Sequence, residues 1–332
     1  MSRLHRVAVS AIGAIMIVGC TSGGAASPGA SSAPSSAPSA APSQVGADGA
    51  VIGFSQANGS DEWRTNQTNK VKEHCASLGE VLVSDALGED ATQSGHVDEF
   101  IARPVDVLLL TPNTAPGLTE AARRALDAGI PVITLDRGVD VEVTQHIGAD
   151  NKLIGRTAAE YVSETILEGN GGKVIEIQGT QGASATVDRH DEFVAWLEEN
   201  DPSVEIVASV DGDYKREKAL TVMNDLLQAH AEGTVDVIYT HNDAMALGVV
   251  AALETAGRLD EFVVVGIDGQ NEAIQAIKDG KIAVTFTYDN AGKEACESAG
   301  KLIAGETIDK QWVLETNTID ASNVDEWIGK GF

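Results

Sequence analysis

The sequence predicts an α/β fold with two lobes, each built on a doubly wound parallel sheet. From Gly49 onward, short β-rich runs alternate with amphipathic segments of helical length, as in proteins made of repeated β-α units. Several runs are almost continuously apolar, for example residues 105–110, which is typical of strands buried on both faces of a parallel sheet. Ten such runs suit two sheets better than one, so we expect two α/β lobes.

The predicted elements follow one another along the chain. The strands are residues 50–54, 81–83, 105–110, 132–135, 145–147, 174–177, 204–210, 235–240, 262–267 and 282–286. The helical segments between them include residues 65–78, 121–128, 151–167, 214–230 and 243–256. Ligands bind outside the carboxyl ends of the strands in open parallel sheets, so the residues that directly follow each strand are the candidate binding residues.

The first part of the chain is predicted to be a leader and a tether. A cationic start precedes an apolar run over residues 7–18, which as a helix is well short of the ~30 Å hydrocarbon core. This pattern indicates a secretory signal over residues 1–19. Residues 20–48 are almost entirely Ser, Ala, Gly and Pro, too poor in apolar side chains to fold. We therefore expect the folded body to work outside the cytoplasm.

The apolar run ends in Ile17-Val18-Gly19-Cys20, which resembles the lipobox of bacterial lipoproteins. The resemblance implies cleavage before Cys20 and acyl chains that hold the protein stably at a membrane, either on the cell surface or in the periplasm. The alternative is an ordinary signal peptide in which the cysteine stands by chance.

Charge and motif spacing exclude several classes of function. The chain carries 23 Lys and Arg against 50 Asp and Glu, a net charge of −27, whereas a nucleic-acid binder needs a positive field. The three cysteines are far apart, and no two histidines lie within four residues of each other, so no zinc-site spacing occurs. We expect no metal, no cofactor and no nucleic-acid partner.

Charged, amide and aromatic side chains gather directly after the predicted strands. Carboxylates, amides and guanidinium groups suit a ligand with many hydroxyls, and aromatic rings suit the C–H faces of a sugar. These residues predict a carbohydrate site: Trp63, Arg64, Asp136, Arg137, Arg189, Tyr214, Asn242 and Asp268.

Four stretches resemble the type I periplasmic sugar-binding proteins, the family of the ribose-binding protein. They occur in the family's order and span nearly the whole folded body: Val132-Ile133-Thr134-Leu135-Asp136-Arg137, Glu176-Ile177-Gln178-Gly179-Thr180, His241-Asn242-Asp243-Ala244-Met245-Ala246-Leu247-Gly248 and Val265-Gly266-Ile267-Asp268-Gly269. The opening Gly53-Phe54-Ser55-Gln56, followed by Trp63-Arg64, is closer to the galactofuranose-binding members. Ribose binders usually carry two phenylalanines in place of Trp63-Arg64.

The resemblance implies two lobes joined by three crossings of the chain, with the ligand between them. The expected lobes are residues 49–148 plus 289–315 and residues 149–288 plus 316–332. It adds three candidates by position: Gln56 from the galactofuranose-type opening, Thr111 in place of a ligand asparagine, and Tyr288 in place of a glutamine.

The function implied is capture of a monosaccharide, furanose or pyranose, by a monomer that closes around it. Each lobe would supply half of the hydrogen bonds, so the ligand stabilises the closed form by its differential affinity. Members of the family deliver their ligand to an ABC permease. The protein is accordingly expected not to be an enzyme.

Several candidates also have a structural explanation. Trp63 stands in a polar run, which favours a stacking platform over a core position. Asp136 and Arg137 could instead form an ion pair between the lobes. Asp188 and Asp243 are expected to cap helices, since Asp is favoured at the N-cap, whereas Asn242 keeps its role as a ligand contact.

Cys75 and Cys296 both map to the first lobe. With the strand order 2-1-3-4-5, the helices that carry them cover the same face of the sheet. A disulfide would persist outside the cytoplasm, and two buried free thiols are the alternative.

Three other functions compete with sugar transport. A sugar-responsive repressor shares the lobe pair but begins with a DNA-binding helix-turn-helix, where this chain has a signal and a tether. A glycosidase would use paired carboxylates, and their spacing is not fixed by the sequence. A receptor for a cyclitol or a furanose-like signal molecule would use the same cleft.

Overall fold

The computed structural model describes residues 49–332. The predicted leader, Cys20 and the tether lie outside these residues. Within them, no helix is both long and apolar enough to cross a lipid bilayer.

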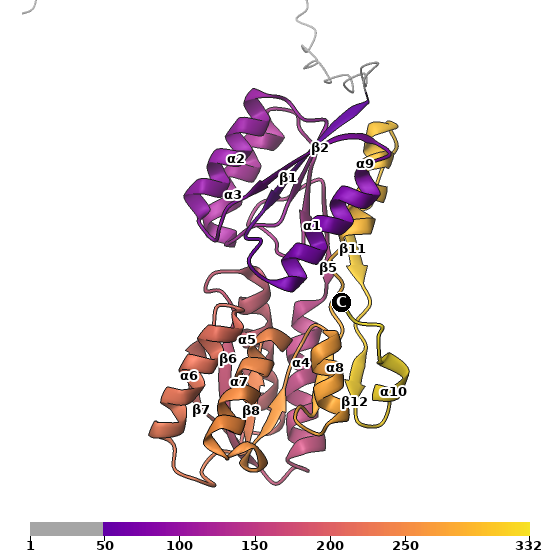
Figure 1. Ribbon diagram of the computed structural model, residues 1–332. Coiled ribbons are helices and arrows are strands. Elements are labelled where there is room, and N and C mark those ends of the chain that lie inside the picture. The colour runs from indigo at the N-terminus through magenta and orange to yellow at the C-terminus, as the bar shows by residue number, and fades with distance from the viewer. Residues whose placement is uncertain (1–48) are drawn as a thin grey trace, which may run out of the picture. The chain divides into compact units, whose positions relative to one another are not determined.

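The first lobe is built on a six-stranded parallel sheet (Figure 1). Its strands run in the order β2-β1-β3-β4-β5-β11, which confirms the predicted order and adds a sixth strand at the edge. The whole of β3 is buried, as expected for a central parallel strand. The strands are β1 (Ala50–Gln56), β2 (Gly79–Asp85), β3 (Val107–Leu110), β4 (Val132–Leu135), β5 (Gln145–Ala149) and β11 (Gln311–Leu314).

Helices cover both faces of this sheet. On one face, α1 (Glu62–Cys75) and α9 (Gly292–Ile303) pack together over a core that includes Phe54, Leu109 and Ile133. On the other face, α2 (Asp90–Ala102) and α3 (Ala115–Asp127) pack over Leu108, Leu110 and Val132. Successive side chains of β3 therefore pack alternately into the apolar cores on the two faces of the sheet.

The second lobe repeats this plan with the strand order β7-β6-β8-β9-β10-β12. All neighbours pair in parallel except β12, which runs antiparallel to β10. The strands are β6 (Gly172–Gln178), β7 (Val204–Asp211), β8 (Val237–Thr240), β9 (Val263–Val265), β10 (Val284–Phe286) and β12 (Thr318–Asp320).

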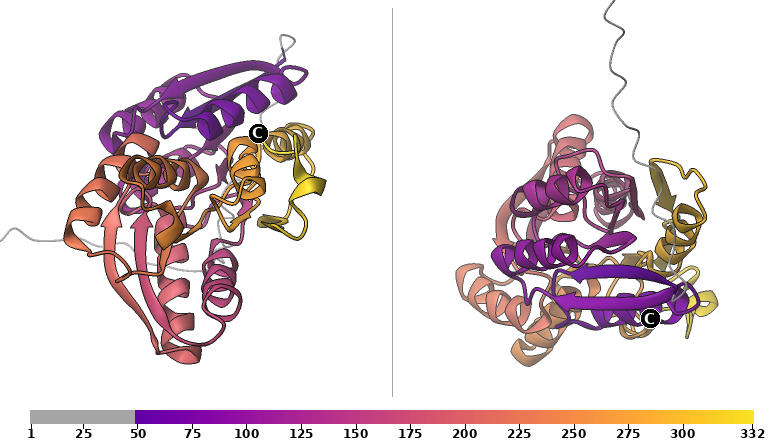
Figure 2. Two further views of the ribbon diagram at one scale, coloured as in Figure 1. Left: turned by 60° about the horizontal axis from the view of Figure 1, so that its bottom comes forward. Right: turned by 90° about the horizontal axis from the view of Figure 1, so that it is seen from above.

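Two helical layers flank the second sheet, as the further views show (Figure 2). One layer packs around Phe193 and Tyr239, whose rings stack at 4.2 Å, and the other packs around Met223 and Leu253. The first layer contains α4 (Asn151–Glu160), its π-helical continuation η1 (Tyr161–Ile166) and α5 (Ser184–Asn200). The second contains α6 (Arg216–Ala229), α7 (Asp243–Ala256) and α8 (Asn271–Lys278), with the short η2 (Leu259–Glu261) and α10 (Val324–Trp327) beside it.

The chain passes between the two sheets three times. The passages connect β5 to α4, β10 to α9, and β11 to β12. Because every passage follows the last residue of a strand, all three lie near the carboxyl edges of the sheets, where ligands of parallel sheets bind.

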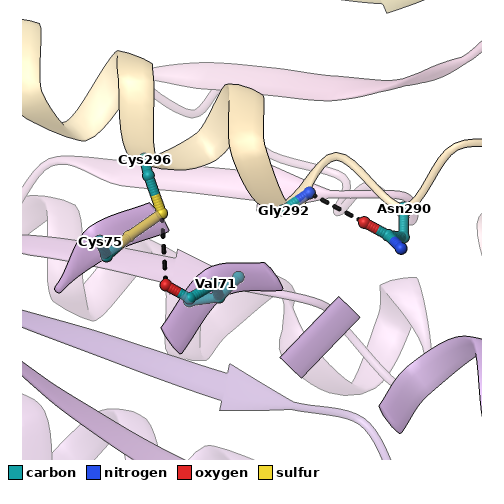
Figure 3. Close-up of a disulfide and its surroundings, with 5 residues drawn as sticks. All are labelled: Val71, Cys75, Asn290, Gly292 and Cys296. Carbon is teal, nitrogen blue, oxygen red and sulfur yellow. Dashed lines mark hydrogen bonds between the residues drawn. A yellow bond between two sulfur atoms is a disulfide. The ribbon is translucent and has the colours of Figure 1, made fainter. Parts of the chain in front are cut away.

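A disulfide joins Cys75, the last residue of α1, to Cys296 in α9 (Figure 3). Both cysteines are buried, and Sγ of Cys296 lies 3.5 Å from the carbonyl oxygen of Val71. Of the two arrangements left open by the sequence, the structure contains the disulfide. It fixes the far end of α1, the helix whose first turn faces the other lobe.

Candidate ligand site between the lobes

A cavity lies between the lobes, and residues of both lobes line it. Five of its lining residues follow strands of the first lobe, five belong to the second lobe, and one lies between β10 and α9. They are Asp61, Trp63, Arg64, Asp136 and Arg137; Ala185, Arg189, Tyr214, Asn242 and Asp268; and Tyr288.

The first turn of α1 supplies an aromatic ring and a cation. Asp61 caps this helix by accepting from the backbone N–H of Arg64 at 2.7 Å, so the helix begins three residues before the predicted start. Trp63 donates from Nε1 to the carbonyl of Tyr288 at 3.1 Å, and the two rings lie 5.7 Å apart. Trp63 also packs into an apolar cluster with Ile154, so it has both a cavity position and a core contact.

Asp136 is the central carboxylate of the first-lobe wall. It lies directly after β4 with a left-handed φ of 64°, and its Oδ2 accepts from Nη2 of Arg64 at 2.6 Å. Burial by itself raises the pKa of Asp136, but the adjacent Arg64 and Arg137 outweigh burial and lower it. The cavity therefore holds an ionised acceptor at neutral pH.

The second lobe contributes a buried arginine from α5. Nε of Arg189 donates to Oδ1 of Asn151 at 2.8 Å, and another nitrogen of the guanidinium donates to the carbonyl of His241. The guanidinium carbon lies 4.5 Å from the ring centroid of Tyr288. These contacts fix the guanidinium in one orientation at the cavity wall.

Asn242 and Asp268 complete the polar wall of the second lobe. Oδ1 of Asn242 accepts from the backbone N–H of Met245 at 2.9 Å, so this side chain caps α7 while lining the cavity. Asp268 is 7% exposed, and burial together with Asp243 raises its pKa well above the usual range, against the opposing effect of Arg189. The protonated form of Asp268 is thus favoured, and a protonated carboxyl can both donate and accept hydrogen bonds at the cavity wall.

The predicted capping roles of Asp243 and Asp188 are wrong. Asn242 is the cap of α7, and Asp243 is fully buried behind it, where it accepts from Oγ1 of Thr285 at 2.7 Å and from N of Gln270 at 2.9 Å. Asp188 lies inside α5, whose N-cap is Ala183. An Asn or Asp at either of two adjacent positions can start a helix, and the sequence alone does not select between them.

Gln56 and Thr111 were predicted as ligand contacts, but they do not line the cavity. Both are buried beneath it and donate to Oε1 of Gln67, at 2.9 Å and 3.1 Å. Asp61 and Ala185 do line the cavity and were not predicted. The capping position before α1 is a usable signal for Asp61, whereas a small apolar residue such as Ala185 carries no chemical signal.

No group of three or more His, Cys, Asp or Glu side chains within residues 49–332 is arranged to hold a metal ion. The cavity is instead lined by three guanidinium groups, three carboxyl groups, an amide and three aromatic rings. Fork-shaped donors beside acceptors and ring faces are the combination that binds a neutral polyhydroxylated molecule.

Residues 52–307 match the family model of the periplasmic binding protein domain. The chain is 35% identical over 242 residues to the ribose import binding protein of Escherichia coli (strain K12), covering 72% of this chain and 79% of that protein. The chain belongs to the type I periplasmic sugar-binding proteins of ABC transporters.

Other members of this sugar-binding family have the same fold. The galactofuranose-binding protein of Escherichia coli (strain K12) is 32% identical over 251 residues, which cover 73% of this chain and 78% of that protein. A crystal structure of a galactofuranose binding protein superposes with a TM-score of 0.80 at 28% identity, covering 85% of this chain and 98% of the other. A solute binding protein from Mycobacterium smegmatis with bound glycerol superposes with a TM-score of 0.79 at 35% identity, covering 85% and 97%.

Membership confirms the predicted fold class and places this sugar-binding protein outside the cytoplasm. The relatives named above are binding proteins.

Proposed function

We propose that the protein captures a monosaccharide in the cavity between its lobes and delivers it to an ABC permease. The observation that supports this most strongly is the composition of the cavity wall, in which Arg64, Asp136 and Arg189 from both lobes surround one space. Neither lobe alone carries the full set of donors and acceptors. Closure around a sugar would exclude water, and each hydrogen bond is stronger in that environment.

The ligand we favour is a sugar in its furanose form. The Trp63-Arg64 pair and the likeness to a galactofuranose-binding protein support this choice. Further structural neighbours are described with bound β-D-fucofuranose and with L-arabinofuranose. A cyclitol is the second candidate, because neighbours with a TM-score of 0.80 are described with bound myo-inositol.

Each side of the cavity has a proposed task. Trp63, Tyr214 and Tyr288 would contact the C–H faces of the ring. Asp136 and Asp268 would accept hydrogen bonds from hydroxyls. The donors would be the three arginines and the amide of Asn242. The residues in these roles are Trp63, Arg64, Asp136, Arg137, Arg189, Tyr214, Asn242, Asp268 and Tyr288.

The lobes are proposed to move as two bodies, residues 49–148 plus 289–315 and residues 149–288 plus 316–332. The three passages between the sheets support this division. Scattering curves recorded with and without ligand should show a more compact particle on binding, at the mass of a monomer. An unchanged curve at ligand saturation would contradict closure.

Anchoring through a lipid on Cys20 is also proposed, on the strength of Ile17-Val18-Gly19-Cys20 alone. The unmodified protein should sediment with membranes, and its N-terminal peptide should carry the mass of acyl chains. Cys20→Ala should remove both the added mass and the sedimentation. Sedimentation of the variant would refute the anchor.

A ligand screen tests the binding proposal. Purified residues 49–332 are heated with methyl β-D-galactofuranoside, D-galactose, L-arabinose, D-ribose, D-fructose or myo-inositol, because a ligand that binds only the folded state raises the melting temperature. The galactofuranoside should give the largest rise, and Arg189→Met should abolish it. Arg258→Met is the matched control, since Arg258 pairs with Glu261 outside the cavity. No rise with any compound, or hydrolysis of the galactofuranoside, would refute the proposal.

A further inference from the structure

Gln67 lies beneath the cavity wall and joins four parts of the first lobe. It is fully buried in α1 and does not line the cavity. Its Oε1 accepts from Gln56 at 2.9 Å, from Thr111 at 3.1 Å and from Nη1 of Arg64 at 3.4 Å. Its Nε2 donates to the carbonyl of Asn290 at 2.7 Å.

We propose that Gln67 is a positioning residue: it fixes the guanidinium of Arg64 for ligand binding and ties it to the chain segment that passes between the lobes after β10. This inference rests on the proposed binding function and adds a residue that determines affinity without touching the ligand.

The acceptor side of Gln67 holds Arg64 in place. Asp136 accepts from Nη2 of this arginine and Gln67 accepts from Nη1, so two different nitrogen atoms are restrained. A guanidinium is a planar fork, and restraints on two of its nitrogens fix its plane. The Arg64 side chain then loses its conformational entropy during folding rather than on binding, and this favours affinity.

The donor side of Gln67 reaches the passage between the lobes. Asn290 is buried, and its Nδ2 donates to Asn66 of α1 at 2.6 Å. A Cβ atom added to Gly292 would lie 2.7 Å from Cβ of Lys70 and 3.2 Å from the carbonyl oxygen of Gln67. The start of α9 therefore approaches α1 too closely for a larger residue, and Figure 3 shows it on the same side of α1 as the disulfide. A shift of this segment is transmitted to Gln67.

Gln56 and Thr111 gain a role from this arrangement. Both lie directly beneath the cavity, at the ends of β1 and β3, and both donate to the oxygen that also accepts from Arg64. They hold the Gln67 amide in one orientation, because flipping it would place an NH₂ group opposite two donors.

A double-mutant cycle separates positioning from general destabilisation. Gln67→Met keeps the side-chain length but removes both polar atoms. We expect it to weaken binding of methyl β-D-galactofuranoside at least about tenfold by calorimetry, and by less than about twofold in an Arg64→Met background. D-galactose and myo-inositol serve as parallel probes. Unchanged affinity for Gln67→Met, or an equal loss in both backgrounds, would overturn the proposal.

Two further variants sharpen the result. Gln67→Glu, ionised beside Arg64, keeps an acceptor oxygen for this arginine but places a second acceptor opposite the carbonyl of Asn290, so affinity should stay within about threefold of the unmodified protein. Gln93→Met is the matched control, because Gln93 is equally buried in the same lobe and bonds Ser55 and Thr111 without contacting Arg64. Its effect on affinity should be the same with and without Arg64→Met.

Hydrogen exchange of the ligand-free protein tests the tie to the passage independently of any sugar. Peptides covering residues 286–292 should exchange faster in both Gln67→Met and Gln67→Glu, and at the unmodified rate in Gln93→Met. Unchanged exchange in Gln67→Glu would overturn the tie. If the unmodified protein binds none of the three probes, the proposed function fails. Hydrogen exchange still decides whether Gln67 holds the segment around Asn290. If Gln67→Met does not fold, hydrogen exchange of Gln67→Glu decides the contact with Asn290, and an equal effect of Gln67→Glu on the free energy of unfolding with and without Arg64→Met would overturn the contact with Arg64.

Discussion

The hydroxyl of Tyr288 donates to Oδ1 of Asp136 at 2.6 Å and so links the two lobes across the cavity. The backbone N–H of Tyr288 donates to the carbonyl of Asp268 in the second lobe, whereas Asp136 follows β4 of the first. Nδ2 of Asn151 donates to the same hydroxyl at 3.1 Å. Burial and the charge of Asp136 raise the pKa of Tyr288 well above its usual range, which keeps the phenol protonated and able to donate.

Removal of this hydroxyl should weaken ligand binding. Tyr288→Phe leaves Asp136 and Asn151 each without one partner, and a hydrogen bond to a charged group contributes ~1.5–3 kcal/mol. We expect an affinity loss of about tenfold or more for methyl β-D-galactofuranoside in calorimetric titrations. Tyr161→Phe is the control, because the Tyr161 hydroxyl donates to Asp320 at 3.1 Å away from the cavity. Equal affinities of the two variants would show that the bridge does not contribute.

Asp268 should contribute directly to affinity. Its side chain lines the cavity, and a ligand hydroxyl left without this buried partner costs ~1–3 kcal/mol, so Asp268→Ala should bind the galactofuranoside several-fold to a hundredfold more weakly. Asp279→Ala, at an exposed position after α8, should bind normally. An unchanged dissociation constant for Asp268→Ala would remove this residue from the site.

Asp243 should make stability fall as the pH rises from about 4 to 7. Burial raises the pKa of Asp243 to about 7 from its usual 3.8, so the folded state binds this proton more tightly than the unfolded state. The resulting stabilisation is fully present below pH 3.8 and is lost as the pH rises through 7, at up to about 1.4 kcal/mol per pH unit.

Asp243→Asn stays neutral and removes this contribution together with the part of the Asp268 shift that Asp243 causes, which has the same sign. The free energy of unfolding of the unmodified protein minus that of the variant, from urea titrations at pH 4, 5.5 and 7, should decrease with pH. Glu176 and His241 titrate in the opposite sense, because their pKa values are lowered in the folded protein, but they are present in both proteins and cancel. A difference that is constant with pH would contradict the assignment.

The disulfide should stabilise the first lobe. Cys75 and Cys296 are separated by 221 residues, and removal of a native disulfide typically costs 2–5 kcal/mol. Purified residues 49–332 should show no free thiol when denatured without reductant and two after reduction. Cys75→Ala/Cys296→Ala should melt at the temperature of the reduced protein and be insensitive to reductant. Two titratable thiols before reduction would contradict the bond.

Most of the predicted strands are short apolar runs bounded by polar residues, and all ten overlap a strand of the structure. The two strands that were not predicted, β11 and β12, lack this pattern. In β11, exposed and half-buried residues alternate at the sheet edge, and β12 has a single apolar residue, Ile319, between two polar ones. These two edge strands hydrogen-bond to β5 and β10, which are distant in sequence. Local sequence patterns do not predict such pairing.

Arg64, Asp136 and Asp268, in which chemistry and place after a strand agree, are among the predicted residues that line the cavity. Gln56 and Thr111 satisfy the same rule but lie one layer deeper, because Gln67 one turn along α1 accepts their hydrogen bonds. The height at which α1 crosses the ends of β1 and β3 decides which polar side chains reach the cavity. Sequence periodicity carries no information on that height.

Apolar periodicity and strand-end chemistry thus determine the two α/β lobes and most of the cavity wall, because burial and the direction of parallel strands are local consequences of residue type. Tertiary structure alone decided that Cys75 and Cys296 are bonded, that Asn242 rather than Asp243 caps α7, and that Tyr288 reaches Asp136. These contacts join segments up to 221 residues apart, and their geometry is set only when the helices and sheets pack.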